Sequence, residues 1–161
     1  MDICVPEVVA VGHRCTYEGR YPEDRKVQKI IDWPDCNTLT EVRGFLGVCG
    51  VVRIWVKDFA KHAKPLVLLT KKDIDFVWGS DQKASMEDLK RAIIMAPCLR
   101  LIDYHTDRWV ILAIDSSCIA TGFILSQLGA DDKRYLSRFG SITWNERELR
   151  YSQAKIEIYG L

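Results

Sequence analysis

The chain has 161 residues, of which 48% are hydrophobic and 28% are charged, and its formal net charge is +1. This composition is typical of a globular protein with one domain or two small modules, and it excludes disordered and collagen-like chains. With no apolar run near the roughly 18 residues of a spanning helix and no signal-like N-terminus, we expect a soluble, intracellular protein without a membrane partner.

The chain is predicted to begin with a short β-hairpin and one helix. Residues 1–20 alternate loosely between apolar and polar side chains, with glycines between them, which fits two short strands joined by a turn. In "YPEDRKVQKIIDWP", Val27, Ile30 and Ile31 lie on one helical face between two prolines. This stretch therefore predicts a short amphipathic helix.

Three more helical stretches are predicted before residue 97. "NTLTEVRGFLGVCGVVRIWV" opens with Thr38 and Glu41 in the spacing of a capping box, which favours a helix. "KDFAKHAKPLVLLTKKD" predicts a short helix that is broken at Pro65. After a loop through "DIDFVWGS", Ser80 or Asp81 is expected to cap a helix over "DQKASMEDLKRAIIMAP".

The second half of the chain changes character. "RWVILAIDSS", "IATGFILSQL" and "RFGSITW" are rich in residues that favour strands, and turn-forming residues such as "GADDKR" separate them. "NERELRYSQAKIEIYGL" then returns to a helical composition, with Ser152 as an expected N-cap. The order of hairpin, helices, three strands and helix predicts the α+β class.

Cationic residues concentrate in residues 43–72, which we call the basic segment. This segment contains seven basic residues and one acid, a local excess of six, and the aromatic residues Trp55 and Phe59 are interleaved with them. Such a segment suits a phosphate backbone, although the same charges also suit a solvated helix face. The candidate nucleic-acid contacts are Arg43, Arg53, Trp55, Lys57, Lys61 and Lys64, where Trp55 is a candidate for base stacking.

Two carboxylates are candidates for a metal site. Asp115 ends an otherwise apolar strand, where an acid can also be a simple turn former. Glu157 lies in the predicted C-terminal helix, so the two side chains could converge on one side of a sheet. Converging carboxylates offer the oxygen ligands that Mg²⁺ accepts, which suggests metal-assisted phosphodiester chemistry.

Five stretches, in chain order, carry a familiar pattern. They are "GHRCTYEGRYPEDRKVQKIIDWP", "TEVRGFLGVCGVVRIWVKDFAKHAKPL", "DFVWGSDQKASMEDLKRAIIMAPCL", "AIDSSCIATGFILSQ" and "NERELRYSQAKIEIYGL". Together they resemble the pol polyprotein of gypsy-type LTR retrotransposons, from the end of the reverse transcriptase to the start of its ribonuclease H. The fourth is similar to the family's T-D-A-S motif, and the fifth to N-E-x-E-x-x-Y-S-x-x-x-x-E.

The resemblance implies a fold and a function. Residues 1–20 would form the end of the reverse transcriptase palm, and residues 21–96 would form the thumb and connection helices. Residues 97–161 would form the N-terminal part of an RNase H-like domain. This part would contain a truncated mixed sheet of three strands and the first helix. Family enzymes copy RNA into DNA and hydrolyse the RNA strand of RNA:DNA hybrids with Mg²⁺. The implied partners are such a hybrid or another nucleic acid and the polymerase-bearing part of a pol polyprotein, in a cytoplasmic virus-like particle or the nucleus.

The resemblance also has limits. It places Asp115 and Glu157 at the first two of the family's four catalytic carboxylates of the ribonuclease H. It implies that the other two carboxylates lie beyond Leu161. It also implies that the catalytic aspartates of the polymerase lie before Met1. "GADDKR" echoes the polymerase motif but lacks its tyrosine, so we expect a solvated turn at Asp131 and Asp132. The alternative function is a non-catalytic remnant that binds nucleic acid through the basic segment or acts as a scaffold.

Overall fold

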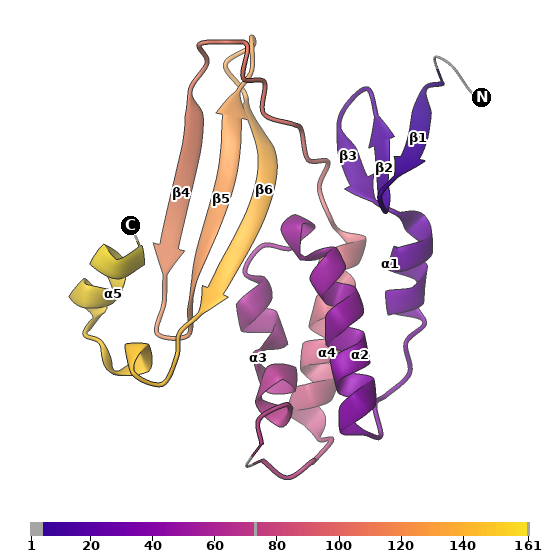
Figure 1. Cartoon of the computed structure of the whole chain (residues 1–161), viewed down its shortest axis with the longest axis vertical. Coiled ribbons are helices and arrows are strands. Elements are labelled where there is room, and N and C mark those ends of the chain that lie inside the picture. The colour runs from indigo at the N-terminus through magenta and orange to yellow at the C-terminus, as the bar shows by residue number, and fades with distance from the viewer. Residues whose placement is uncertain (1–4, 73, 161) are drawn as a thin grey trace.

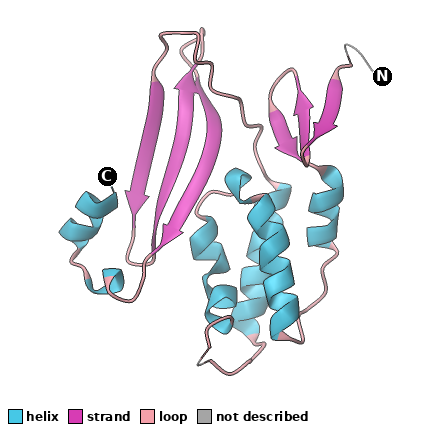
Figure 2. Cartoon of the chain, viewed as in Figure 1, coloured by secondary structure: helices cyan, strands magenta, loops and turns pink. Residues whose placement is uncertain are grey.

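The computed structural model describes residues 5–72 and 74–160. The helices α1 to α4 form a bundle that lies beneath a sheet of strands β1 to β3 and beside a second sheet of strands β4 to β6 (Figure 1). Figure 2 shows the two sheets on separate parts of the chain, with the helices next to both. The α+β class is confirmed. None of the described helices is long and apolar enough to span a bilayer.

The first sheet is antiparallel and has the order β1-β2-β3. Val11 and Gly12 form its first turn, with positive φ angles of 51° and 77°. The sequence predicts only two strands here, whereas the structure adds a third that pairs with β2. Residues 1–4 of the predicted hairpin lie outside the described residues. The strands are β1 (Glu7–Ala10), β2 (His13–Thr16) and β3 (Arg20–Pro22).

The helices α1 (Asp24–Ile31) and α2 (Leu39–Val51) form where the apolar periodicity predicts them. The Thr38 hydroxyl caps α2 by accepting a hydrogen bond from the Glu41 backbone N–H at 3.3 Å. Val42 and Phe45 on the inner face of α2 are fully buried. Burial of each such side chain stabilises the fold by about 1.5–3 kcal/mol.

The helix α3 (Phe59–Leu69) runs through Pro65, so the predicted break at this proline is wrong. Proline cannot donate the backbone hydrogen bond of its position, which costs a helix about 3 kcal/mol. However, Ala63, Leu66 and Leu69 are all buried in the core. Their burial offsets the lost hydrogen bond, because each leucine alone contributes roughly 1.5–3 kcal/mol.

The helix α4 (Ser80–Ile94) begins one residue earlier than its predicted caps require. Gly79 is the N-cap residue, and its backbone N–H donates a hydrogen bond to Gln82 Oε1 at 3.1 Å. Ser80 and Asp81, the predicted caps, therefore lie in the first turn. The long connection after α4 passes the first sheet, where the backbones of Arg20 and Leu99 form an isolated bridge, and enters the second sheet (Figure 1).

The second sheet has the order β4-β5-β6, and its described strands are all antiparallel rather than mixed. Asp115 in β4 pairs with Gly122 in β5. A short helix η2 (Glu148–Arg150) precedes the last helix, which lies beside β4 (Figure 1). The main elements are β4 (Val110–Ser116), β5 (Ala120–Leu128), β6 (Arg134–Thr143) and α5 (Gln153–Gly160).

The helical bundle and the second sheet share one hydrophobic core. Phe139 of β6 belongs to the cluster of buried helix side chains, and Ile124 and Leu136 pack against that cluster. The short helix η1 (Arg53–Trp55) and α3 also contact β6. The two parts of the chain are therefore one packed unit, in which η1 and α3 contact β6, and α3 also contacts β5, the strand that pairs with β4.

Candidate functional site

Asp115 lies one residue before the end of β4, and its side chain is exposed. Ser117, two residues later, closes a tight turn into β5. The Ser117 backbone N–H donates to the Ala120 carbonyl at 3.0 Å, and the Ser117 hydroxyl donates to the same carbonyl at 3.0 Å. The turn thus ends the apolar strand and leaves the carboxylate at an open end of the sheet.

Glu157 lies in α5 and is linked to the same end of β4. The Gln153 side-chain amide donates one hydrogen bond to Glu157 Oε1 at 2.7 Å and another to the Ser116 carbonyl at 3.5 Å. Ile156, between these two helix residues, is buried at 3% exposure. The structure therefore brings the helix that carries Glu157 to the residue next to Asp115.

An aromatic cluster holds α5 in this position. The Tyr159 ring lies 6.0 Å from Trp144 and 5.8 Å from Tyr151, both in edge-on geometry. Trp144 Nε1 also donates to the Ser117 carbonyl at 2.7 Å, so the cluster is tied to the turn after Asp115. Such aromatic pairs contribute about 0.5–1.5 kcal/mol each beyond their burial.

A small cavity of about 100 Å³ adjoins Asp115. Its lining includes Lys57 and Asp58 from the helical part and Gly122 from β5. Carboxylate oxygens are the ligands that Mg²⁺ prefers, so Asp115 and Glu157 are chemically suited to a divalent cation. Within residues 5–72 and 74–160, no group of three or more acidic, histidine or cysteine side chains is arranged to hold a metal ion.

The candidate cations of the basic segment divide into two groups. Lys57 and Arg43 are exposed, and Lys64 is half-buried, so all three reach the surface. Arg43 also donates to the Thr70 carbonyl at 3.5 Å. Lys61 forms an ion pair with Asp58, with 3.7 Å between Nζ and Oδ2. Surface pairs of this kind contribute little to stability and remain open to exchange with phosphate.

Two other candidates, Arg53 and Trp55, make structural contacts, although Arg53 is also exposed. Arg53 Nη2 donates to the Ser141 carbonyl of β6 at 2.7 Å, which joins the helical part to the second sheet. Trp55 is only 2% exposed, and its Nε1 donates to the Arg20 carbonyl at 3.2 Å. The proposed base stacking by Trp55 is therefore wrong, because neither face of its ring is free. In this structure, the Arg53 side chain links η1 to β6.

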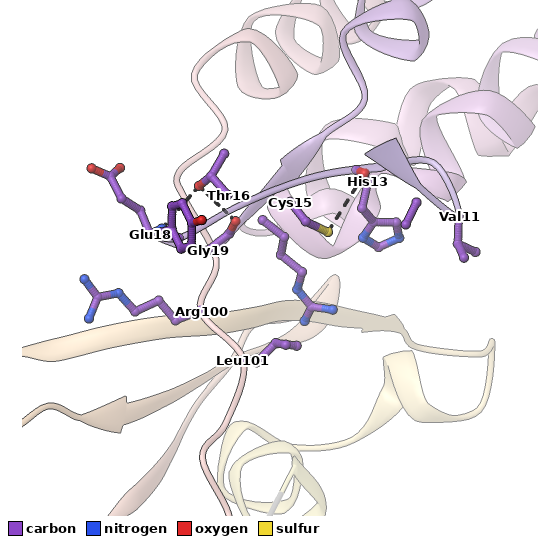
Figure 3. Close-up of a pocket in the computed structure, with 11 residues that line it drawn as sticks. Val11, His13, Cys15, Thr16, Glu18, Gly19, Arg100 and Leu101 are labelled. Atoms are coloured by element: carbon purple, nitrogen blue, oxygen red, sulfur yellow. Dashed lines mark hydrogen bonds between the residues drawn. The ribbon is translucent and has the colours of Figure 1, made fainter. Parts of the chain in front are cut away.

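One pocket among the described residues was missed by sequence reasoning. It has a volume of about 580 Å³ and lies between the first sheet and the start of the connection after α4. Figure 3 shows His13 and Cys15 on one side of it and Arg100 and Leu101 on the other. Burial, together with the charges of Arg20 and Lys26, lowers the pKa of His13, which keeps the imidazole neutral near pH 7. The pocket forms between residues about eighty positions apart in the chain, so no local sequence pattern could predict it.

The turn at "GADDKR" matches its prediction. Asp131 and Asp132 are both exposed between β5 and β6, and Asp131 accepts a hydrogen bond from the Tyr135 hydroxyl at 2.9 Å. This hydrogen bond lowers the pKa of Asp131, and hydrogen bonds from the backbone N–H and the side chain of Lys133 lower it further. The pair is a solvated turn.

Known proteins are similar to almost the whole chain. The Tf2-3 and Tf2-4 transposon polyproteins of Schizosaccharomyces pombe are each 28% identical to it over 155 residues, which is 96% of this chain and 12% of each polyprotein. The chain thus spans about an eighth of the length of these relatives. The resemblance to retrotransposon polyproteins is confirmed.

Solved structures share the fold. A foamy viral protease-reverse transcriptase in complex with double-stranded DNA superposes with a TM-score of 0.81 and 20% identity, over 96% of this chain and 27% of that one. The foamy viral enzyme in complex with an RNA/DNA hybrid gives a TM-score of 0.80 and 21% identity, over 95% of this chain and 21% of that one.

A family profile matches slightly more than half of the chain. It describes an RNase H-like domain found in reverse transcriptase and covers residues 78–161. The match starts ahead of α4, whereas the sequence predicts this unit from residue 97 onward. It includes β4, β5, β6 and α5, the elements that carry Asp115 and Glu157. The chain therefore belongs to the family of RNase H-like domains found in reverse transcriptase.

Proposed function

We propose that the chain is the part of a retrotransposon reverse transcriptase that holds an RNA:DNA hybrid and supplies two carboxylates to a ribonuclease H site. The observation that carries this proposal is the Gln153 side chain, which bridges Glu157 to the residue next to Asp115. The complete enzyme would copy RNA into DNA and hydrolyse the RNA strand of the hybrid as an endonuclease.

The two acids have defined parts in this proposal. Asp115 and Glu157 would hold Mg²⁺ through carboxylate oxygens, and the bound cation would activate water and stabilise negative charge on the phosphodiester. Gln153 orients Glu157 by donating to one of its oxygens, and it leaves the other oxygen free for a ligand. Two-metal chemistry requires further acids, which we propose are supplied by other parts of the polyprotein.

The surface cations would hold the nucleic acid. Lys57, Lys64 and Arg43 are accessible on the helical part, and Lys57 adjoins the cavity at Asp115. A foamy viral enzyme with the same fold has been solved with an RNA/DNA hybrid, which supports this ligand class. Each phosphate neutralised by a lysine or arginine makes affinity more salt-dependent.

The proposal extends to the biological setting. We propose a gypsy-type LTR element as the origin, a polymerase-bearing part of the same pol polyprotein as the partner, and a cytoplasmic virus-like particle or the nucleus as the location. The similarity to transposon polyproteins over 96% of the chain supports this origin.

A non-catalytic role is the second candidate. The accessible cations lie on α2, α3 and the residues before α3, so they could bind nucleic acid without either acid. In that case the chain would act as a binding module or scaffold. Only the first candidate function includes metal-dependent cleavage of RNA.

The test combines binding and cleavage on one labelled RNA:DNA hybrid. We expect affinity of the chain that falls steeply with salt. In the complete polyprotein enzyme, which supplies the remaining acids, we expect RNA cleavage in Mg²⁺ or Mn²⁺ that Asp115→Asn and Glu157→Gln each remove. Asp132→Asn, an exposed acid in the β5–β6 turn, is the matched control and should behave as the wild type. Salt-dependent binding without cleavage would favour the non-catalytic candidate, and no binding at low salt would exclude both.

A further inference from the structure

The turn formed by Lys57 and Asp58 connects η1 to α3 and has an unusual backbone. Asp58 adopts the left-handed conformation with φ of 53° and ψ of 34°, which few residues other than glycine adopt. Its carbonyl accepts hydrogen bonds from the Lys61 and His62 backbone N–H groups at 2.9 and 3.4 Å, which starts α3. Strained backbone of this kind persists only where the surroundings hold it in place.

This turn lies against the strand pair that carries Asp115. Asp115 and Gly122 are cross-strand partners, so their side-chain positions share one face of the sheet. A Cβ atom on Gly122 would lie 2.6 Å from Asp58 Oδ1, which shows that the turn covers this face at Gly122. Lys57, Asp58 and Asp115 also line the same cavity of about 100 Å³.

Both flanks of the turn are fastened to one residue of β6. Before the turn, Arg53 Nη2 donates to the Ser141 carbonyl at 2.7 Å, and after it the Ala60 backbone N–H donates to the Ser141 hydroxyl at 3.0 Å. Ser141 is itself 6% exposed. The turn is thus fixed relative to the sheet, as a residue that contacts substrate needs to be.

Lys57 has a free charge at this position. Lys61 is paired with Asp58, whereas none of the ion pairs formed by the described residues involves Lys57, which is exposed. A hydrolytic site built from carboxylates repels the phosphates of its substrate unless cations lie nearby. Lysine supplies a compact charge of this kind to phosphate groups.

We infer that the Lys57–Asp58 turn is part of the Asp115 site, and that Lys57 binds a backbone phosphate of the hybrid next to the phosphodiester that Asp115 faces. The helical part of the chain would then contribute directly to the ribonuclease H site, beyond its general affinity for nucleic acid. This inference rests on the proposed function, because it assumes that a divalent cation binds at Asp115.

Iron-mediated cleavage of the 161-residue chain with bound hybrid tests the geometry. Fe²⁺ in place of Mg²⁺, with ascorbate and peroxide, cuts a polypeptide backbone close to the bound ion. We expect cuts around Asp115, Glu157 and the Lys57–Asp58 turn, all of which excess Mg²⁺ and Asp115→Asn remove, while Asp132→Asn leaves them in place. Cuts at the two acids but not at the turn would overturn the inference alone. No cuts at any of these places would overturn the metal site as well.

The role of Lys57 is tested by substitution. At about 0.1 M salt, loss of one phosphate contact should weaken hybrid binding by about eightfold and reduce the salt slope by about 0.9. We expect this for Lys57→Gln, recovery with Lys57→Arg, and no change with Lys29→Gln, an exposed lysine on α1.

The phosphate itself is identified from the same iron experiment, because Fe²⁺ also cuts the hybrid at the nearest nucleotide. A neutral methylphosphonate at the adjoining phosphate should weaken binding to the wild type but cause no further loss in Lys57→Gln, since both changes remove one contact. Fully additive losses would show that Lys57 binds elsewhere and would overturn its assignment.

Discussion

Ser141 is the residue that joins the two halves of the molecule. Its hydroxyl accepts a hydrogen bond from the Ala60 backbone N–H, one of the orphan donors at the start of α3, and Asp58 provides no side-chain cap there. The sheet therefore caps a helix that lies more than eighty residues earlier in the chain.

We predict that Ser141→Ala lowers the free energy of unfolding by about 1–2 kcal/mol, because it leaves a buried N–H without a partner. Urea denaturation followed by circular dichroism measures this change. Ser80→Ala, on the exposed start of α4, is the control and should change the value by less than about 0.5 kcal/mol. Equal effects of the two substitutions would contradict the role of Ser141.

Cys49 makes stability depend on pH at the alkaline end. Burial raises the pKa of the Cys49 thiol from 9.0 to about 12. Because the folded-state pKa lies above the unfolded one, the thiol contributes its full stabilisation below about pH 9 and loses it as the pH rises toward 12. The slope from this group is about 1.4 kcal/mol per pH unit in that window.

We therefore predict that the free energy of unfolding falls between pH 9 and 11, and that Cys49→Ala makes this fall shallower. Urea denaturation in reducing buffer at several pH values measures the slopes. Cys118→Ala removes an exposed thiol and should leave the slope as in the wild type. An unchanged slope in Cys49→Ala would show that this thiol ionises freely in the folded state.

Among the elements, α3 shows how packing overrides a local signal. Pro65 lies in the helix interior, where it removes a backbone hydrogen bond, and α3 continues because the residues around it are buried. We predict that Pro65→Ala raises the free energy of unfolding by about 1–3 kcal/mol, because it restores the bond.

Urea denaturation measures this gain, and Lys64→Ala on the same turn is the matched control, with an expected change below about 0.5 kcal/mol. Destabilisation by Pro65→Ala would show that the pyrrolidine ring fills space that an alanine leaves empty.

Local sequence patterns predicted the helices and strands whose formation depends on neighbouring residues in the chain. The apolar periodicity predicted α1, α2 and α4, the Thr38 cap was confirmed, and the β-rich runs formed β4, β5 and β6. The strand β3 (Arg20–Pro22) was missed because three residues carry no periodicity, and its pairing depends on β2 and on Leu99. Its formation is a tertiary effect.

The candidate site was predictable to a similar degree. Family motifs placed Asp115 and Glu157, and the structure brings their elements together through Gln153, which the sequence gave no reason to single out. Arg53 and Lys57 are both exposed, and the charge pattern could not show that only the Arg53 guanidinium binds β6. That difference depends on contacts between residues about ninety positions apart.

At the scale of the whole molecule, one core joins the helical bundle and the second sheet. Phe139 of β6 is 7% exposed and belongs to the cluster of helix side chains. We predict that Phe139→Ala lowers the free energy of unfolding by about 3–5 kcal/mol and weakens hydrogen-exchange protection in α2 and β5 together.

Hydrogen exchange with mass spectrometry measures both elements in one experiment. Ile142→Ala, on the same strand but 61% exposed, is the control and should leave protection in both elements unchanged. Loss of protection in β5 with α2 intact would show that the sheet and the bundle unfold separately.

The central claim is that Asp115 and Glu157 hold one divalent cation together, and Mn²⁺ titration followed by electron paramagnetic resonance tests it most directly. We predict that Asp115→Asn and Glu157→Gln each weaken Mn²⁺ binding by about tenfold or more, and that the double variant is no weaker than either single variant, because both remove the same site. Asp132→Asn should bind as the wild type does. Wild-type binding no tighter than that of the double variant, or losses that add independently, would contradict the claim.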